Sequence, residues 1–197
     1  MGQYYKPVVL KEDYEKESFP CILTLTPWKM GIGAKLMEHS YVGNNFVEAF
    51  AQIIHKNNAK GYADNRVVWC GDYSEPINDN SIYHLAKQCD ASGFYLEEYT
   101  DGVQRPYQYI VNTDKGQYVK VKPYNENKWT IHPLPLLTAY GNGQGGGDYY
   151  GSDMDKVGIW AFDHVYTSDE VPEGYEELVV DRQGRYRRAL KIVSSEK

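Results

Sequence analysis

The chain has 197 residues, a formal net charge of −6 and a pI near 5.4. This acidity argues against a long nucleic acid as the main partner, because binding a phosphate backbone needs a basic surface. The length fits a single domain over residues 1–197, with a C-terminal hairpin at about residues 175–193.

The cysteine pattern and the apolar runs bear on compartment and cofactors. The three cysteines are widely spaced, and no CxxC or zinc-type spacing occurs, which indicates buried, reduced thiols. The first residues, MGQYYKPVVL, lack the apolar core of a signal peptide, and no apolar run reaches membrane-spanning length. We therefore expect a cytoplasmic protein with no membrane contact, no cofactor and no metal ion.

Tyrosine is the unusual residue type, with 19 copies beside four tryptophans and five phenylalanines. Its flat apolar ring and its hydroxyl suit half-buried strands, and they suit ligand or partner surfaces as well. The composition alone leaves both uses open.

The chain begins with strand signals and continues with a helical one. Residues 4–10 and 21–28 flank a charged turn and predict a hairpin. Residues 34–41 predict a short helical turn that is broken at Gly43.

The clearest helix signal follows over residues 45–56, where Asn44 or Asn45 is placed as the N-cap. Residues 66–70, RVVWC, are almost wholly apolar and predict a central buried strand. The apolar positions of the helix recur at helical spacing: Phe46, Val47, Phe50, Ile53 and Ile54.

A second, shorter helix is predicted over residues 81–89, and strand signals dominate after it. Residues 107–123 predict a hairpin, residues 156–168 predict another strand, and the terminal hairpin turns at about residues 181–184. The expected fold class is α+β: a mostly antiparallel mixed sheet with two amphipathic helices packed on one face.

Four segments together resemble a family of small bacterial and phage proteins for which no activity is established. They are MGQYYK, GAKLMEHSYVGNNF, VVWCGDYSE and HPLPLLTAYGNGQGGGDYYG, within residues 1 to 166. The resemblance implies a bacterial or phage intracellular setting and transfers no catalytic residue.

A glycine-rich loop, GNGQGGG over residues 141–147, follows the apolar run of the last segment. A P-loop would continue with Lys-Ser/Thr and a helix, and a dinucleotide fingerprint also needs a following helix, whereas Asp148 comes next here. We expect a flexible loop that closes over a ligand rather than a phosphate cradle. Asn142, Gln144 and Asp148 could then hydrogen-bond sugar hydroxyls or an amide.

Two other segments carry candidate site residues. Lys35 precedes His39 by four residues, so on a helical turn both would share one face and form a cationic patch. Asp72 and Tyr73 directly follow the buried strand 66–70, where side chains often project into a cleft. Structural roles, in the core for His39 and in a capping turn for Asp72, are the competing interpretations.

The remaining candidates are two histidines. His132 precedes Pro133 and is therefore expected at the end of an extended segment, either as a structural residue or in a site. Asp163 and His164 are neighbours on a predicted strand, so one of them must face the interior or a cleft.

The leading hypothesis is a non-enzymatic protein that binds or sequesters a small nucleotide-like ligand, with aromatic side chains stacking on the base. Three segments would form the cleft: residues 35–44, residues 72–73 and the glycine loop. The expected ligand-binding residues are Lys35, His39, Asn44, Asp72, Tyr73, Asn142, Gln144 and Asp148.

Two alternatives belong to other classes. One is a hydrolase of a phosphodiester or glycosidic bond, with His39 or His132 as the acid–base group and Asp72 or Asp148 as its partner. The other is a protein-binding module that uses an acidic, tyrosine-rich surface.

Overall fold

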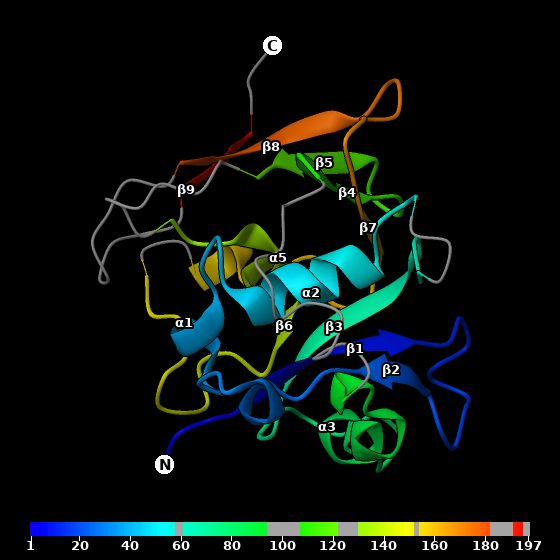
Figure 1. Ribbon diagram of the computed structural model, residues 1–197, viewed down its shortest axis with the longest axis vertical. Helices are drawn as coiled ribbons and strands as arrows, with labels where there is room; N and C mark the ends of the chain where they lie inside the picture. The colour runs from blue at the N-terminus through cyan, green and yellow to red at the C-terminus, as the bar shows by residue number, and fades with distance from the viewer. Residues whose placement is uncertain (58–60, 94–106, 122–129, 152–153, 182–190, 195–197) are drawn as a thin grey trace.

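The sheet dominates the architecture and confirms the α+β fold (Figure 1). A computed structural model describes residues 1–57, 61–93, 107–121, 130–151, 154–181 and 191–194. Its nine-stranded mixed sheet has the order β2-β1-β3-β7-β4-β5-β8-β9, with β6 paired to β3. The strands are β1 Tyr5–Leu10, β2 Cys21–Thr24, β3 Asn65–Gly71, β4 Tyr109–Asn112, β5 Gln117–Lys120, β6 Ala139–Tyr140, β7 His164–Ser168, β8 Glu176–Asp181 and β9 Lys191–Ser194.

Short helices surround the sheet. They are η1 Pro27–Met30, α1 Leu36–His39, α2 Asn45–Ile53, α3 Ile82–Leu85, η2 Ala86–Cys89, α5 Pro133–Leu137 and η3 Met154–Lys156. In the described part of the chain, no helix is long and apolar enough to cross a membrane.

The strand β1 lies between β2 and β3 and is antiparallel to both. Its side chains alternate between two apolar clusters, with Tyr5 and Val9 on one face of the sheet and Val8 and Leu10 on the other. Because both faces of this strand are covered, the sheet has a core on each side. We name the two sides the α2 face and the α3 face after the helices that cover them.

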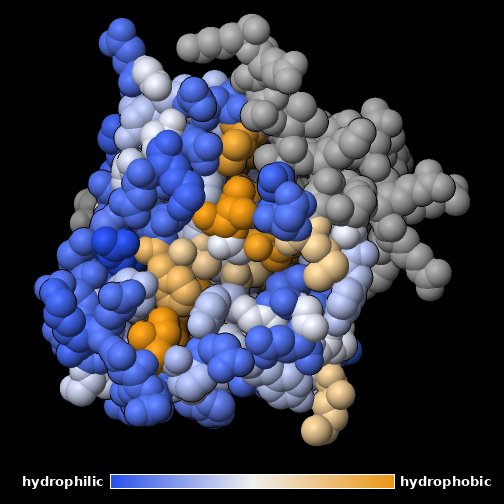
Figure 2. All heavy atoms as spheres, turned by 180° about the vertical axis from the view of Figure 1, so that it is seen from behind, coloured by the Kyte–Doolittle hydropathy of each residue, from blue (hydrophilic) through white to orange (hydrophobic). Residues whose placement is uncertain are grey.

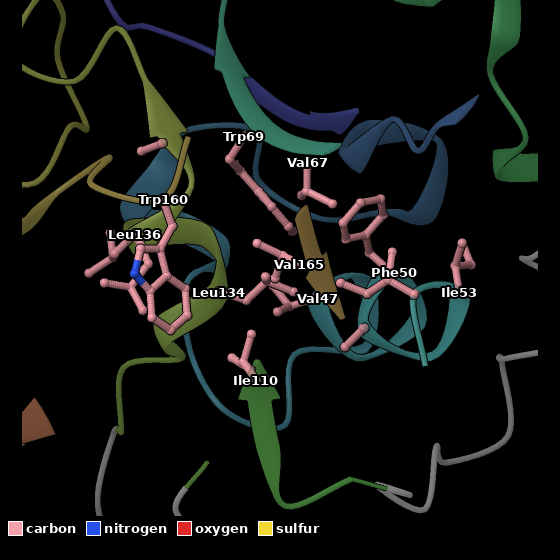
Figure 3. Close-up of a cluster of buried hydrophobic side chains, with 14 of the residues drawn as sticks. Val47, Phe50, Ile53, Val67, Trp69, Ile110, Leu134, Leu136, Trp160 and Val165 are labelled. Atoms are coloured by element: carbon pink, nitrogen blue, oxygen red, sulfur yellow. The ribbon is translucent and has the colours of Figure 1, made fainter. Parts of the chain in front are cut away.

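The helix α2 forms where the sequence predicts it, because its apolar residues line one side and Asn44 caps its first turn. Figure 3 shows Val47, Phe50 and Ile53 of α2 packed in one cluster with Leu134 and Leu136 of α5. The cluster also holds side chains from the sheet and from the segment before β7: Val67, Trp69, Ile110, Trp160 and Val165.

The second predicted helix lies on the opposite face of the sheet from α2. It is divided into α3 and η2, and its residues Ile82, Tyr83 and Ala86 pack in the same cluster as Val8 and Val68. Apolar side chains of β1 and β3 alternate between the two faces of the sheet, so both faces are apolar. The α3 face therefore needs a helix of its own to shield it from water. The amphipathic pattern predicted a helix here but carried no information about which face it covers.

Two further segments differ from the expected elements. Residues 133–137 form the helix α5, because Pro133 suits the first helical position and His132 caps it. Of the predicted strand 156–168, residues 164–168 form β7, whereas a turn precedes them in which Gly158 and Phe162 have φ of 80° and 70°.

The terminal strands β8 and β9 pair antiparallel from Leu178↔Ser194 to Asp181↔Lys191. Residues 182–190, which include most of the predicted turn at residues 181–184, lie outside the described part of the chain. Seen from behind, the molecule has hydrophobic side chains gathered in the middle of its surface and hydrophilic ones around them (Figure 2).

The cap of α2 offers a direct test of this fold. The Asn44 side-chain oxygen accepts hydrogen bonds from the backbone N–H groups of Phe46 (3.0 Å) and Val47 (3.3 Å). We expect Asn44→Ala to lower the free energy of unfolding by about 1 kcal/mol, measured by urea denaturation. Asn44→Ser keeps an oxygen acceptor and is the matched control. Equal losses in both variants would contradict the capping role.

Candidate functional site

Three of the segments predicted to bind a ligand meet around the N-terminal residues 2–5. Three successive backbone N–H groups of this segment donate to different parts of the chain: to the carbonyl of Gly146 at 3.0 Å, to the Asp72 carboxylate at 2.9 Å and to the carbonyl of Ala34 at 2.7 Å. The glycine loop, the turn after β3 and the start of α1 are therefore neighbours. The sequence pattern predicted these segments but carried no signal for the N-terminal residues that connect them.

The glycine loop forms a cradle for an anion, and the anion is the protein's own Asp148. Its Oδ2 atom accepts hydrogen bonds from the N–H groups of Gly143 (2.7 Å), Gln144 (2.9 Å) and Gly145 (3.0 Å). Consecutive N–H groups converge in this way in phosphate-binding nests. A phosphate would have to displace Asp148 to use the same donors.

Side-chain bonds to the two tyrosines just after it also hold the loop. The Asn142 side chain bonds both backbone groups of Tyr149, accepting from its N–H at 2.8 Å and donating to its carbonyl at 3.0 Å. The Tyr150 hydroxyl donates to the carbonyl of Gly145 at 2.9 Å. The loop expected to be flexible is thus held by side-chain bonds, whereas the side chain of Gln144 is exposed.

Lys35 lies against this loop but is not an isolated cation. A Cβ on Gly147 would collide with the aliphatic part of Lys35, so the glycine permits this close approach. The ammonium group of Lys35 is 3.1 Å from the Glu38 carboxylate, and both side chains are 37% exposed. Much of its charge is therefore balanced within α1.

His39 is a core residue, which corrects its predicted place in a cationic patch. It is fully buried, its Nδ1 lies 2.9 Å from the Gly33 carbonyl, and the indole N–H of Trp69 donates to its Nε2 at 2.8 Å. The imidazole is therefore neutral, with its proton on Nδ1. Burial lowers its pKa from 6.5 to about 4. Periodicity placed His39 on the face of Lys35, but packing against Trp69 turns it inward.

Asn44 is buried as well and serves α2 as its N-cap. Asn44 lies next to the predicted cleft because α2 begins there, but its side chain is not at the surface. It therefore does not join the other candidates at the glycine loop.

His132 belongs to a buried network on the α2 face. Its Nδ1 accepts from the N–H of Leu134 at 3.2 Å, so Nε2 carries the proton toward the hydroxyl of Tyr107, 3.0 Å away. That hydroxyl in turn donates to the buried carboxylate of Glu48. The network caps α5 and compensates the burial of Glu48.

In the described part of the chain, the histidines of the hydrolase hypothesis bond groups other than its aspartates. The ring nitrogens of His39 bond Gly33 and Trp69, and those of His132 bond Leu134 and Tyr107. The two aspartates bond backbone N–H groups.

A histidine–carboxylate cluster that the sequence only hinted at lies at the other end of the sheet. His164 has Asp114 at 2.7 Å from Nδ1 and Glu12 at 2.5 Å from Nε2, and Arg66 pairs with Glu12 at 2.9 Å. Partial burial lowers the His164 pKa, but the two carboxylates outweigh it and raise the pKa overall. An imidazolium with both protons bound has no lone pair to act as a base. Among the described residues, no group of three or more His, Cys, Asp or Glu side chains could hold a metal ion.

Exposed apolar side chains gather at the glycine-loop end of the sheet. They come from the N-terminal segment, from the turn after β3 and from the residues that follow the loop, which the hydrogen bonds above hold together. Aromatic rings on such a surface can stack on a ligand or pack on a partner. These residues are Met1, Tyr4, Tyr73, Tyr150 and Met154.

A group of buried polar side chains lies beneath the same loop, and we call it the Gln3–Tyr5–Asp148 cluster. Within the described ranges, both polar atoms of Gln3, the Tyr5 hydroxyl and Oδ1 of Asp148 are buried without a hydrogen-bond partner. A Cβ on Gly71 or Gly141 would collide with the Gln3 amide, so both glycines make room for it. Burial raises the pKa of Tyr5, and the Asp148 carboxylate raises it further through its charge and through its side-chain interaction with the Tyr5 hydroxyl. The sequence pattern carried no signal for Gln3 and Tyr5, because their burial depends on the loop that covers them.

Comparison with protein-family models, curated protein sequences and solved structures found no match to this chain. The resemblance to small bacterial and phage proteins therefore remains a prediction.

The buried state of His39 predicts a dependence of stability on pH. Its pKa is lowered in the folded protein, so the unfolded chain binds more protons between pH 6.5 and about 4, and stability falls as the pH drops through this window. The loss attributable to His39 is about 3 kcal/mol. His39→Gln should flatten the dependence of the unfolding free energy on pH, whereas His84→Gln on the exposed side of α3 should not. An unchanged slope in His39→Gln would contradict this assignment.

Proposed function

We propose that this protein is a small-ligand-binding protein and that its site is the Gln3–Tyr5–Asp148 cluster together with the tyrosines above it. The ligand is small, polar and nucleoside-like: it carries hydrogen-bond donors and acceptors on a flat ring. Free cysteines and the resemblance to bacterial and phage proteins support a cytoplasmic, bacterial setting.

The observation that carries the proposal is the set of unpartnered polar atoms in this cluster. Leaving a buried polar group without a hydrogen bond costs about 1–3 kcal/mol, and proteins avoid it outside sites that bind water or a ligand. Gln3 offers a donor and an acceptor, Tyr5 a hydroxyl and Asp148 an acceptor, so a ligand with matching groups would remove several such costs at once.

The chemistry of the cluster favours a base or a sugar over a phosphate. The backbone donors that could hold a phosphate already bind Asp148, and the Lys35 ammonium pairs with Glu38. A carboxylate and an amide instead match the hydroxyls of a ribose or the edge of a base. Tyr4, Tyr73 and Tyr150 are exposed at the same end and supply rings for stacking.

Entry requires the glycine loop to separate from the N-terminal segment. Two backbone hydrogen bonds join them, from Gln3 to the carbonyl of Gly146 and from Gly146 to the carbonyl of Met1, each at 3.0 Å. A third backbone bond, from the N–H of Met37 to the carbonyl of Gly147 at 3.1 Å, fastens the end of the loop to α1. The side-chain bonds described for the loop are internal and can move with it. The loop would thus open as a unit and close over the ligand.

A protein partner is a second candidate function, because the exposed tyrosines and methionines gather on one surface. The two functions differ in the role of the buried cluster, since a partner that binds the exposed tyrosines does not need Gln3 or Tyr5. A hydrolase is disfavoured, because the expected histidine–aspartate pairs are absent from the described residues.

The test is isothermal titration and thermal shift with nucleosides, nucleotides, cyclic nucleotides and nucleotide sugars, with chromatography of each compound afterwards. We expect one class to raise Tm and to be recovered intact. Tyr5→Phe and Gln3→Met should raise Kd roughly tenfold, since each removes about one hydrogen bond to the ligand.

Tyr14→Phe, in the turn that follows β1, is the matched control and should bind like the unmodified protein. Equal affinity in Tyr5→Phe and Gln3→Met would place the ligand elsewhere and overturn the proposal. A consumed compound would favour the hydrolase. If no compound raises Tm, the exposed tyrosines become the leading site and a protein partner the leading function.

A further inference from the structure

The two halves of the sheet, β2-β1-β3 and β7-β4-β5, are joined by a short pairing between β3 and β7, which we call the seam. The ladder between β1 and β3 spans six residue pairs, whereas the seam has two, Asn65↔Val165 and Arg66↔His164. The strand β6 pairs with β3 farther along the chain. The seam is therefore the shortest ladder on the path from β1 to β5.

The backbone adds two hydrogen bonds beside this ladder. The N–H of Val67 donates to the carbonyl of Asp163 at 3.0 Å, and the N–H of Phe162 donates to the carbonyl of Val67 at 2.9 Å. Because few backbone bonds cross the seam, side chains that bridge it affect how tightly it closes.

Four charged side chains bridge the seam, and we call them the His164 clasp: Glu12, Arg66, Asp114 and His164. Asp114 lies 2.7 Å from Nδ1 of His164, and Glu12 lies 2.5 Å from Nε2. Arg66 pairs with the same two carboxylates, at 2.9 Å from Glu12 and 3.6 Å from Asp114. Glu12 lies in the turn after β1 and Asp114 in the turn between β4 and β5, so the clasp connects the two halves of the sheet.

The geometry of the clasp requires a doubly protonated imidazole. A carboxylate offers only lone pairs, so each of the two contacts needs an N–H group on the ring, and a neutral imidazole has only one. After loss of a proton, a ring lone pair would face a carboxylate oxygen in one of the contacts. The His164 side chain is 18% exposed, so it can exchange protons with water.

The charges around His164 support the same protonation state. Partial burial lowers the His164 pKa, but the Asp114 and Glu12 carboxylates outweigh burial and the opposing charge of Arg66, so the pKa lies above 6.5. Hydrogen bonds from His164 and Arg66 lower the pKa of Glu12. For Asp114, the hydrogen bonds from His164 outweigh partial burial and lower the pKa as well. Both carboxylates are therefore ionised when His164 titrates.

The other charged side chains beside the clasp have partners of their own. Lys115 pairs with Asp163, and the carboxylate of Asp64 accepts a hydrogen bond from the Thr113 hydroxyl at 2.7 Å. Arg66 keeps its charge at any pH at which the protein is folded. Protonation of His164 is therefore the change that pH makes in the clasp near neutrality.

We propose that the His164 clasp is a pH-sensitive switch of the seam, closed while both ring nitrogens of His164 carry a proton and released when one proton passes to water. Release frees the turn over residues 11–20 from β7 and leaves the seam to its few backbone bonds. The switch is independent of the glycine-loop site, which lies at the other end of β1.

The direction of the pH effect follows from the raised pKa. The folded protein holds the His164 proton more tightly than the unfolded chain, so the clasp stabilises fully below pH 6.5 while its carboxylates stay ionised. This contribution is lost as the pH rises through the raised pKa of folded His164. It is distinct from the effect of His39, which acts below pH 6.5.

The experiment combines two NMR measurements on the full-length protein. Nitrogen chemical shifts of the imidazole locate the His164 titration, and we expect both ring nitrogens to be protonated on its acidic side. Amide hydrogen exchange of Val67 and Phe162 is then compared on the two sides of this titration, after correction for the intrinsic effect of pH. We expect their protection to fall roughly five-fold on the alkaline side, as one or two partly exposed ion pairs are lost.

Three variants separate the clasp from other groups that titrate. His164→Gln has no charge at any pH, so the seam amides should be weakly protected on both sides of the titration. His164→Arg keeps a positive charge and several N–H donors, so protection should stay high on both sides. His84→Gln alters an exposed histidine of α3 and should behave like the unmodified protein.

Three results would overturn the proposal. One is a His164 ring with a single proton on the acidic side of the titration. Another is equal protection of the seam amides on both sides in the unmodified protein. The third is an alkaline loss of protection that persists in His164→Arg, since a group other than His164 would then cause it.

Discussion

The pairing of β1 with β3 is the constraint on which the rest of the structure depends. Its register runs without a break from Tyr5↔Gly71 to Leu10↔Arg66. At one end it brings the N-terminal residues beneath the glycine loop, and at the other it brings Arg66 to Glu12 and His164. A shift by one residue would exchange the two faces of β1 and dismantle both cores.

The same register explains why a lysine lies in an apolar core. Strict alternation along β1 puts Lys6 on the same face as Val8 and on the opposite face from Tyr5, so its side chain enters the core of the α3 face. A buried lysine is costly and is rare in proteins unless it is paired or used. Here its Nζ lies 4.3 Å from the centre of the Tyr83 ring, and Cys70 is its register partner.

Buried charges elsewhere in the molecule are compensated by hydrogen bonds. Asp148 is held by three backbone N–H groups, and Glu48 accepts from Tyr107 and from the backbone of Gly43. His39 avoids the problem by remaining neutral beside Trp69. Among the described residues, single side-chain atoms of Lys6, Asn44 and His55 are buried without a hydrogen-bond partner, whereas the Gln3–Tyr5–Asp148 cluster brings several such atoms together.

The sequence by itself determined the elements whose signals are local. The helix α2 follows from the helical spacing of apolar residues such as Phe46 and Phe50 and from the N-cap Asn44. The central strand β3 follows from the apolar run at residues 66–70. Asp148 directly follows the glycines, where a P-loop would have Lys-Ser/Thr, so the sequence alone argued against a phosphate-binding loop. These predictions hold because helix periodicity, capping and loop motifs depend on residues within a few positions of each other.

The tertiary structure decided which side chains meet and which way they face. Asp148 fills the nest of its own loop, His39 turns toward Trp69, and Lys6 lies beside Cys70 and Tyr83. Each of these contacts joins segments that are distant in the chain, and strand order and register set them. A local pattern places a residue on a face of its own element, but the elements that pack against that face decide whether the residue is a ligand, a core group or a reactive one.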